Sequence, residues 1–178
     1  MRDVLRPNLL LRGARAEDSS CLAALGAQSW LHTYATEGIR PSIARYVHEH
    51  LTPDAFLTQI RRTDAATIVA EVDDHLVGYA IVELAKPCPV RRSASAHLDK
   101  LYVQEPFLGR GIGFGLLQGA RAEAGSRGDN SGIWLTVNSM NNRARTFYSR
   151  QGFIDIGHTY FDLYGENHEN RILHAPAA

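Results

Sequence analysis

Four glycines at alternate positions constrain this chain more than any other feature of its sequence. Gly109, Gly111, Gly113 and Gly115 follow an apolar, strand-like segment, 96–103, and open a segment with helical spacing. Glycine allows tight turns and a close approach of the main chain to a ligand. The first N–H groups of a helix have no intrahelical partner, so they favour an anion. We therefore predict a strand, a phosphate-binding loop and a helix; a tight turn without a ligand is the alternative.

This loop differs from two common nucleotide-binding loops. The loop that binds nucleoside triphosphates ends in Gly-Lys-Ser/Thr, whereas Phe114 follows Gly113 here. The dinucleotide fingerprint needs a third glycine three places after its second one. Counted from either start in this loop, that place holds Phe114 or Leu116. The predicted diphosphate therefore belongs to another class of ligand.

The rest of the chain alternates between strand and helix patterns, with no internal repeat or linker. A hairpin followed by strand, helix, strand, helix and strand predicts a mixed α/β sheet in a single domain, 1–178. Asp18 is expected to cap the first helix, and Pro41 and Pro53 suit first helical positions. The expected strands are 8–12, 67–72, 76–84, 96–103, 132–137, 153–162 and 171–174. One helix is expected to begin at 18, and four others are expected at 41–50, 53–62, 111–124 and 141–151.

Charge and composition exclude several classes of function. Nineteen basic residues balance nineteen acidic ones, whereas a protein that binds nucleic acid through phosphates needs a basic excess. No segment approaches the roughly 18–20 apolar residues of a membrane span. Cys21 and Cys88 match no metal or redox spacing, and the pair His48 and His50 lacks a third ligand. We expect a cytoplasmic protein without a nucleic acid, membrane or metal partner.

Two motifs, in this order and spacing, resemble those of the GNAT superfamily of acyl-CoA-dependent N-acyltransferases. Residues 108–113, Leu-Gly-Arg-Gly-Ile-Gly, resemble its first motif, Gln/Arg-x-x-Gly-x-Gly/Ala. Residues 141–153, Asn-Asn-Arg-Ala-Arg-Thr-Phe-Tyr-Ser-Arg-Gln-Gly-Phe, resemble its second, Asn-x-x-Ala-x-x-x-Tyr followed by Gly-Phe. The resemblance is close over 97–153. It departs at Leu108, which stands at the opening Gln/Arg position, so we expect weaker fixation of the loop and not lost binding.

The resemblance implies a fold, a cosubstrate and a binding site. The fold is a mixed, mostly antiparallel sheet of about seven strands flanked by helices, and the cosubstrate is acetyl-CoA. The backbone of Leu101 and Val103 would pair with the pantetheine arm, and Asn141 would hydrogen-bond to it. Tyr148 would lie beside the thioester sulfur. The pyrophosphate would be wrapped by the main-chain N–H groups of Gly109, Arg110, Gly111, Ile112, Gly113 and Phe114.

Helical spacing supports the pair Asn141 and Tyr148 independently. The two positions are seven apart, about two helical turns, so their side chains share one face. The alternative is that Tyr148 packs in a core and Asn141 only caps the helix. Tyrosine has an ordinary pKa of about 10, above that of a thiol. Tyr148 is therefore the expected general acid for the departing thiolate.

The general base is less constrained than the acid. His97 stands where family members often carry Glu, and an imidazole can take a proton near neutral pH. Asp99, two residues on, shares its strand face and is a second candidate. Alternatively, His97 is a satisfied histidine of the sheet and Asp99 is a partner of Arg92 or Lys100.

The expected reaction is direct transfer of an acetyl group to the primary amine of a small molecule. Segment 97–103 and the tail 163–170 are similar to a polyamine-acetylating branch, although ordinary solvated loop charges would explain the tail equally well. A protein or peptide amine in an open groove and a non-catalytic acyl-CoA-binding regulator are the alternatives. Exposed aromatic residues near the C-terminus could serve a homodimer, which is common in the superfamily. Aromatic and acidic residues suited to a cationic amine are Trp30, His32, Tyr34, Glu37, Tyr160, Phe161, Asp162, Tyr164, Glu166 and Glu169.

Overall fold

A computed structural model describes residues 8–127 and 131–177, and the strands of this part of the chain form one sheet. Seven described strands follow the order β1-β2-β3-β4-β5-β7-β6, and every neighbouring pair except β4 and β5 is antiparallel. The expected mixed, mostly antiparallel sheet flanked by helices is confirmed. The strands are β1 (Leu9–Gly13), β2 (Ala65–Val72), β3 (His75–Glu83), β4 (Ala96–Val103), β5 (Ile133–Asn138), β6 (Ile154–Leu163) and β7 (Glu166–Ala175).

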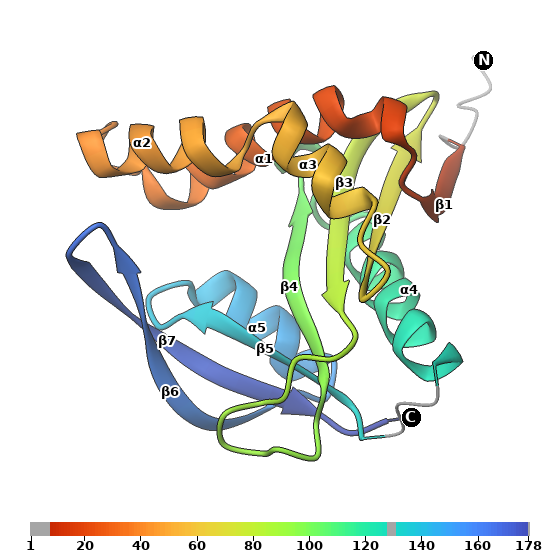
Figure 1. The fold of residues 1–178 in the computed structure, drawn as a ribbon, viewed down its shortest axis with the longest axis vertical. Helices are drawn as coiled ribbons and strands as arrows, with labels where there is room; N and C mark the ends of the chain where they lie inside the picture. The colour runs from red at the N-terminus through yellow and green to blue at the C-terminus, as the bar shows by residue number, and fades with distance from the viewer. Residues whose placement is uncertain (1–7, 128–130, 178) are drawn as a thin grey trace, which may run out of the picture.

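Helices cover both faces of the sheet (Figure 1). Alternate residues of β2 and β3 point to the two sides, so Val69 and Tyr79 pack against one group of helices and Ile68 and Ala80 against the other. Burial on both faces explains the nearly continuous apolar sequence of these strands. One face carries α1 (Ser19–Tyr34), α2 (Pro41–His50) and α3 (Pro53–Ile60), and the other carries α4 (Ile112–Ser126) and α5 (Asn142–Arg150). None of the described helices is both long and apolar enough to cross a membrane.

Two local expectations are wrong. The tail 163–170 is largely strand, because β7 begins at Glu166 and pairs with β6 across a tight turn at Tyr164 and Gly165. Asp18 precedes α1, but its side chain accepts no hydrogen bond from the first turn of that helix. Its carboxylate instead accepts the Arg15 N–H at 2.7 Å and forms an ion pair with Arg12 at 2.7 Å. The carboxylate therefore joins β1 to the short 3₁₀ turn η1 (Ala16–Asp18).

The sheet splits between β4 and β5. The two parallel strands pair only at Ala96–Ile133 and His97–Trp134. Beyond these pairs they diverge, and β5, β7 and β6 form a separate wing of the sheet (Figure 1). The facing backbone edges of β4 and β5 past the split therefore have no strand between them.

A β-bulge at Asp99 changes which residues of β4 face each side. Lys100 pairs with Ile81 of β3, and Leu98 pairs with the next residue of β3, Val82. Asp99 is therefore an extra residue without a partner on β3. A bulge shifts the alternation of side chains by one residue. The residues that pack towards α4 are consequently Ala96, Leu98, Leu101 and Val103.

Candidate active site

Two cavities lie beside the split in the sheet. The first, of about 870 Å³, lies between α1, β4, the N-terminal end of α4 and α5. The second, of about 170 Å³, lies between α1, α2, β4, β5 and the β6–β7 hairpin. Tyr102 of β4 lines both. The two cavities therefore share one wall residue on this strand.

Most of the residues expected to bind the cosubstrate line the first cavity. Arg110 and Ile112 are outside its lining. Ile112 is buried in the core, and the guanidinium of Arg110 lies 5.1 Å from the ring centre of Phe107. The role expected for both is a main-chain one, which their side-chain positions leave unchanged. The residues that do line the cavity are Leu101, Val103, Gly109, Gly111, Gly113, Phe114, Asn141 and Tyr148.

Glycine is needed in this loop for two separate structural reasons. Gly109 and Gly111 have φ angles of +74° and +82° and open space where a Cβ would stand, so backbone conformation requires glycine there. Gly115 lies inside α4, where a Cβ would stand 2.8 Å from Cδ1 of Leu11 in β1. The first two glycines shape the turn that opens α4, and Gly115 lets a strand approach the helix.

Asn141 and Tyr148 lie on the wall of the first cavity from opposite ends of α5. Oδ1 of Asn141 accepts the Ala144 N–H at 3.0 Å and caps the helix, which leaves its amide NH₂ for a ligand. The Tyr148 ring packs between Phe147 and Phe153, with ring centres 5.2 and 5.3 Å away. Burial raises the pKa of Tyr148 above its ordinary value, so the phenol keeps its proton at neutral pH. Asn141 thus caps the helix and Tyr148 packs in the core, and both residues also line the cavity.

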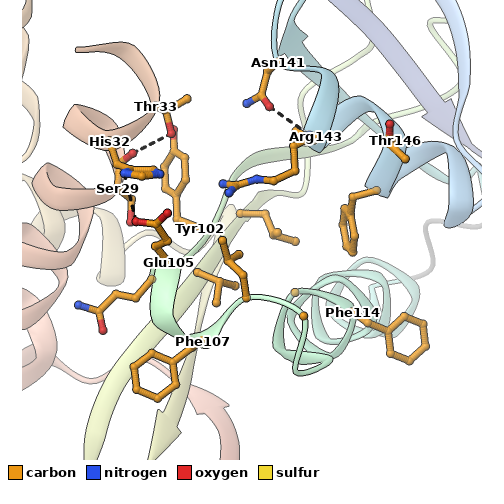
Figure 2. A pocket seen from close by; sticks show the side chains of 18 of the residues that line it. Ser29, His32, Thr33, Tyr102, Glu105, Phe107, Phe114, Asn141, Arg143 and Thr146 are labelled. Atoms are coloured by element: carbon orange, nitrogen blue, oxygen red, sulfur yellow. Dashed lines mark hydrogen bonds and ion pairs between the residues drawn. The ribbon is translucent and has the colours of Figure 1, made fainter. Parts of the chain in front are cut away.

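Sequence reasoning missed the charged residues of this cavity. Arg143 and Arg150 of α5 line it, and Figure 2 shows the Arg143 side chain reaching into the cavity between α1 and α5. Their spacing of seven places them on one helix face, as with Asn141 and Tyr148, so periodicity could have found them. Opposite them His32 and Glu105 lie 3.6 Å apart. Two guanidinium groups beside a helix N-terminus favour an anionic ligand.

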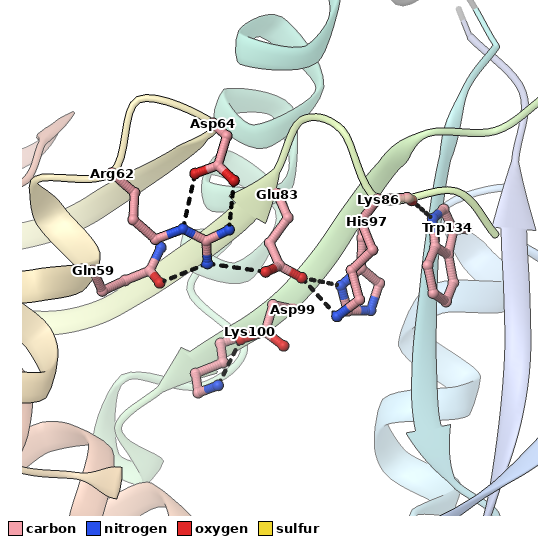
Figure 3. Close-up of polar contacts among 9 residues, drawn as sticks. All are labelled: Gln59, Arg62, Asp64, Glu83, Lys86, His97, Asp99, Lys100 and Trp134. Atoms are coloured by element: carbon pink, nitrogen blue, oxygen red, sulfur yellow. Dashed lines mark hydrogen bonds and ion pairs between the residues drawn. The ribbon is translucent and has the colours of Figure 1, made fainter.

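His97 lies in a polar network outside the lining of both cavities (Figure 3). Its Nδ1 is 2.9 Å from Oε2 of Glu83, and its ring centre is 4.1 Å from that of Trp134. Arg62 and Lys86 also donate to Glu83, at 3.0 and 2.7 Å. The hydrogen bond with His97, ahead of those from the two cations, holds the pKa of Glu83 well below its usual range despite its burial. These are the contacts of a satisfied histidine of the sheet; its role as the base stays a prediction.

Asp99 and Lys100 are the charged residues that β4 presents to the second cavity. Nζ of Lys100 donates to Oδ2 of Asp99 at 2.6 Å, so the expected pairing of these two residues is confirmed. One ligand atom from each of Glu83, His97 and Asp99 lies within 4.8 Å of the others. The cations already bound to Glu83 would repel a metal ion at that point, so the cluster suits proton transfer better than metal binding.

The residues expected to recognise the amine are divided by the structure. Trp30, Tyr34 and Phe161 line the second cavity, whereas His32 lines the first. The expected carboxylates are outside the lining of the second cavity, and three of them have partners of their own. Glu166 binds Arg40, Glu169 binds Arg171, and Asp162 accepts the Gly165 N–H. The carboxylate of this cavity is that of Asp99.

A family comparison decides what these cavities belong to. The model of the acetyltransferase (GNAT) family matches residues 28–153, which include both motifs and Tyr102. The chain belongs to this family. An uncharacterized N-acetyltransferase of Mycobacterium tuberculosis (strain ATCC 25618 / H37Rv) is 30% identical over 153 residues, 86% of this GNAT chain and 93% of the relative. A relative from Mycobacterium bovis has the same identity and coverage. The expected acyltransferase, an N-acetyltransferase of the GNAT family, is thereby confirmed.

Solved structures share the fold over almost the whole chain. The PaiA N-acetyltransferase of Thermoplasma acidophilum in complex with coenzyme A has a TM-score of 0.77, 23% identity, and coverage of 95% of this chain and 99% of the other. A putative phosphinothricin N-acetyltransferase has a TM-score of 0.71 and 20% identity, and the match covers 96% of this chain and 99% of the other. The ribosomal-protein-alanine N-acetyltransferase of Brucella melitensis has a TM-score of 0.69 and 22% identity, and the match covers 94% of this chain and 99% of the other. At these identities the likeness shows the GNAT fold.

Proposed function

We propose that this GNAT protein transfers the acetyl group of acetyl-CoA directly to the primary amine of a small molecule held in the second cavity. The observation that carries the proposal is that Tyr102, at the split between β4 and β5, lines both cavities. One cavity is large enough for an extended cosubstrate and the other suits a small acceptor. Neighbours named for phosphinothricin and for a ribosomal-protein alanine share the fold, so the acceptor must be argued from this chain's own residues.

The residues of the first cavity fit acetyl-CoA, which supplies an activated acetyl thioester. Leu101 and Val103 offer an unpaired strand edge to the amides of the pantetheine arm. The N–H groups at the start of α4 would bind the pyrophosphate, and Arg143 and Arg150 add positive charge. The PaiA neighbour, whose structure contains coenzyme A, supports this assignment. Tyr148 would donate a proton to the departing sulfur.

Asp99 is the acidic group best placed for the acceptor amine. An amine enters as an ammonium ion and must lose a proton before it can attack. Asp99 lines the second cavity, whereas His97 is outside its lining and has a ring nitrogen within 4.8 Å of an Asp99 carboxylate oxygen. We therefore assign contact with the ammonium to Asp99 and keep His97 as the proposed base behind it, with Glu83 holding its ring.

Contacts between α2 and the β6–β7 hairpin favour a small acceptor over a polypeptide. Glu166 binds both Arg40 and Ser42, and the hydroxyl of Tyr164 donates to Glu49. These contacts bridge the N-terminal helices and the final strands, where a polypeptide acceptor would need an open groove. A non-catalytic regulator is disfavoured by Tyr148, which keeps its place in the cosubstrate cavity.

The proposal is tested by release of CoA thiol from acetyl-CoA on addition of amines. Amino acids, their decarboxylated amines, spermidine and a short peptide make the panel, and mass spectrometry identifies the acetylated product. Saturable, amine-dependent release with a small molecule supports the proposal. Release with the peptide alone would assign a polypeptide acceptor. Silence across the panel, with acetyl-CoA still bound in a titration, would contradict the small-molecule function.

A further inference from the structure

We infer that the acceptor carries a carboxylate beside its amine, as an amino acid does, and that Lys100 binds this carboxylate. The inference rests on the proposed function, because it names the acceptor class of the second cavity. It departs from the expected polyamine. The observations that carry it are the charge of Lys100, unpartnered polar nitrogens in the same wall, and the balance of charge around the cavity.

Lys100 is a largely enclosed cation with spare hydrogen-bond donors. Its side chain is only 22% exposed. An ammonium group has three N–H donors, and the hydrogen bond of this one within the described residues goes to Asp99. Burial lowers the pKa of Lys100, but Asp99, Tyr46 and Glu83 outweigh burial and leave it raised. Lys100 therefore stays charged and can bind an anion that enters the cavity.

Two further nitrogens of residues in this wall make no hydrogen bond within the described part of the chain. Nε1 of Trp30 and Nε2 of His168 are buried without a hydrogen-bond partner among the described residues, and both residues line the second cavity. Glu166 approaches the His168 nitrogen only to 3.7 Å. A buried donor without a partner costs about 1–3 kcal/mol. A ligand rich in acceptor oxygens, such as a carboxylate, would satisfy groups that a polyamine cannot.

The balance of charge also favours a zwitterion over a polycation. The two cations that line the cavity, Arg40 and Lys100, are each paired with a carboxylate, Glu166 and Asp99 respectively, so this wall is close to neutral. A polyamine would bring several ammonium groups to a wall whose lining offers one carboxylate, and the ammonium groups would repel Arg40 and Lys100. An amino acid can instead exchange partners with the Asp99–Lys100 pair, placing its ammonium on Asp99 and its carboxylate on Lys100. The volume of about 170 Å³ suits a molecule of that size.

The first test compares each amino acid with the amine that differs from it only by loss of the carboxylate. Phenylalanine with phenethylamine, methionine with 3-methylthiopropylamine, and lysine with cadaverine are suitable pairs. We expect kcat/KM to be at least about 10-fold higher for the carboxylated member of the active pairs, as a charge-assisted hydrogen bond implies. Preference for the decarboxylated amine in every active pair, or for spermidine, overturns the inference and leaves the proposed function standing. Silence with every amine overturns both.

The second test replaces Lys100 and uses an exposed arginine, Arg61, as its control. Lys100→Met removes the ammonium and keeps an apolar stem, and Arg61→Met removes a cation outside the lining of both cavities. For Lys100→Met we expect KM for the carboxylated acceptor to rise about 10- to 100-fold, while KM for its decarboxylated partner changes less than about 3-fold. Arg61→Met should leave both unchanged.

Fold and cosubstrate binding are controlled in the same variants. Circular dichroism and an acetyl-CoA titration should match the wild type for both substitutions, since neither residue lines the first cavity. A merely structural role of Lys100 would raise KM for both members of a pair equally. That result, or no change for either member, would overturn the assignment of the carboxylate to Lys100.

Discussion

Replacing Tyr148 by Phe separates acid catalysis from cosubstrate binding. The substitution removes a single hydroxyl, which has no hydrogen-bond partner among the described residues, and keeps a ring that packs against Phe147 and Phe153. The free energy of unfolding should therefore change by less than about 1 kcal/mol. Turnover should fall about 10- to 1000-fold, because the departing thiolate loses its proton donor. This is about 1.4–4 kcal/mol in the activation free energy.

The assay for Tyr148→Phe is initial-rate thiol release at saturating acetyl-CoA, with the affinity for acetyl-CoA measured separately by titration. Tyr160→Phe is the matched control, because Tyr160 is 61% exposed and lies outside the lining of both cavities. Since burial raises the Tyr148 pKa, this phenol should stay protonated as the pH rises through 9. Turnover of Tyr148→Phe within about 2-fold of the wild type would refute the assignment of Tyr148 as the general acid.

Three other substitutions test the framework of the site. Asp18→Asn should lower the free energy of unfolding by about 1–3 kcal/mol at pH 7 in denaturant titrations. Because the Arg12 hydrogen bond lowers the Asp18 pKa, the folded state binds fewer protons than the unfolded state in acid, so this difference should shrink as the pH falls below about 4. Gly111→Ala, at φ +82°, should weaken acetyl-CoA binding about 5- to 30-fold in a titration, since the left-handed backbone costs about 1–2 kcal/mol. Arg143→Ala should raise KM for acetyl-CoA about 10-fold with kcat unchanged, as measured by thiol release.

Local signals explain which elements could be predicted closely. The helix 41–50 and the strand 96–103 have the bounds that the sequence predicted, because a proline opens the helix and an apolar run marks the strand. The first half of β7 was missed, since Glu166–Asn170 is polar and contains no apolar alternation. Its strand conformation comes from pairing with β6, between Leu163–Glu166 and Thr159–Asn170. Such pairing depends on the turn between the strands more than on the composition of either.

The same distinction divides the candidate site. The first cavity is built around two continuous motifs, so its glycines, Asn141 and Tyr148 could be predicted from sequence. The second cavity is assembled from α1, α2, β4, β5, β6 and β7, and no motif spans those segments. From the acidic residues of the tail, the sequence therefore predicted that Glu166 and Glu169 would bind the amine. In the structure these two side chains form ion pairs with Arg40 and Arg171 instead.

The position of Lys100 follows from a signal that was present in the sequence. Apolar residues that pack towards α4 stand at 96 and 98, and then at 101 and 103, so the two-residue period slips by one between Leu98 and Leu101. That slip is what a β-bulge produces. Without it, Lys100 would share a face with Ala96 and Leu98 and point into the α4 core. The bulge places Asp99 and Lys100 together on the side of the second cavity, just beyond the split from β5. Deleting Asp99 would close the bulge and restore regular alternation, with Ala96, Leu98, Leu101 and Val103 still towards α4. Lys100 would then still face the second cavity, but without its carboxylate partner, so the deletion should remove the anion of that wall and keep its cation.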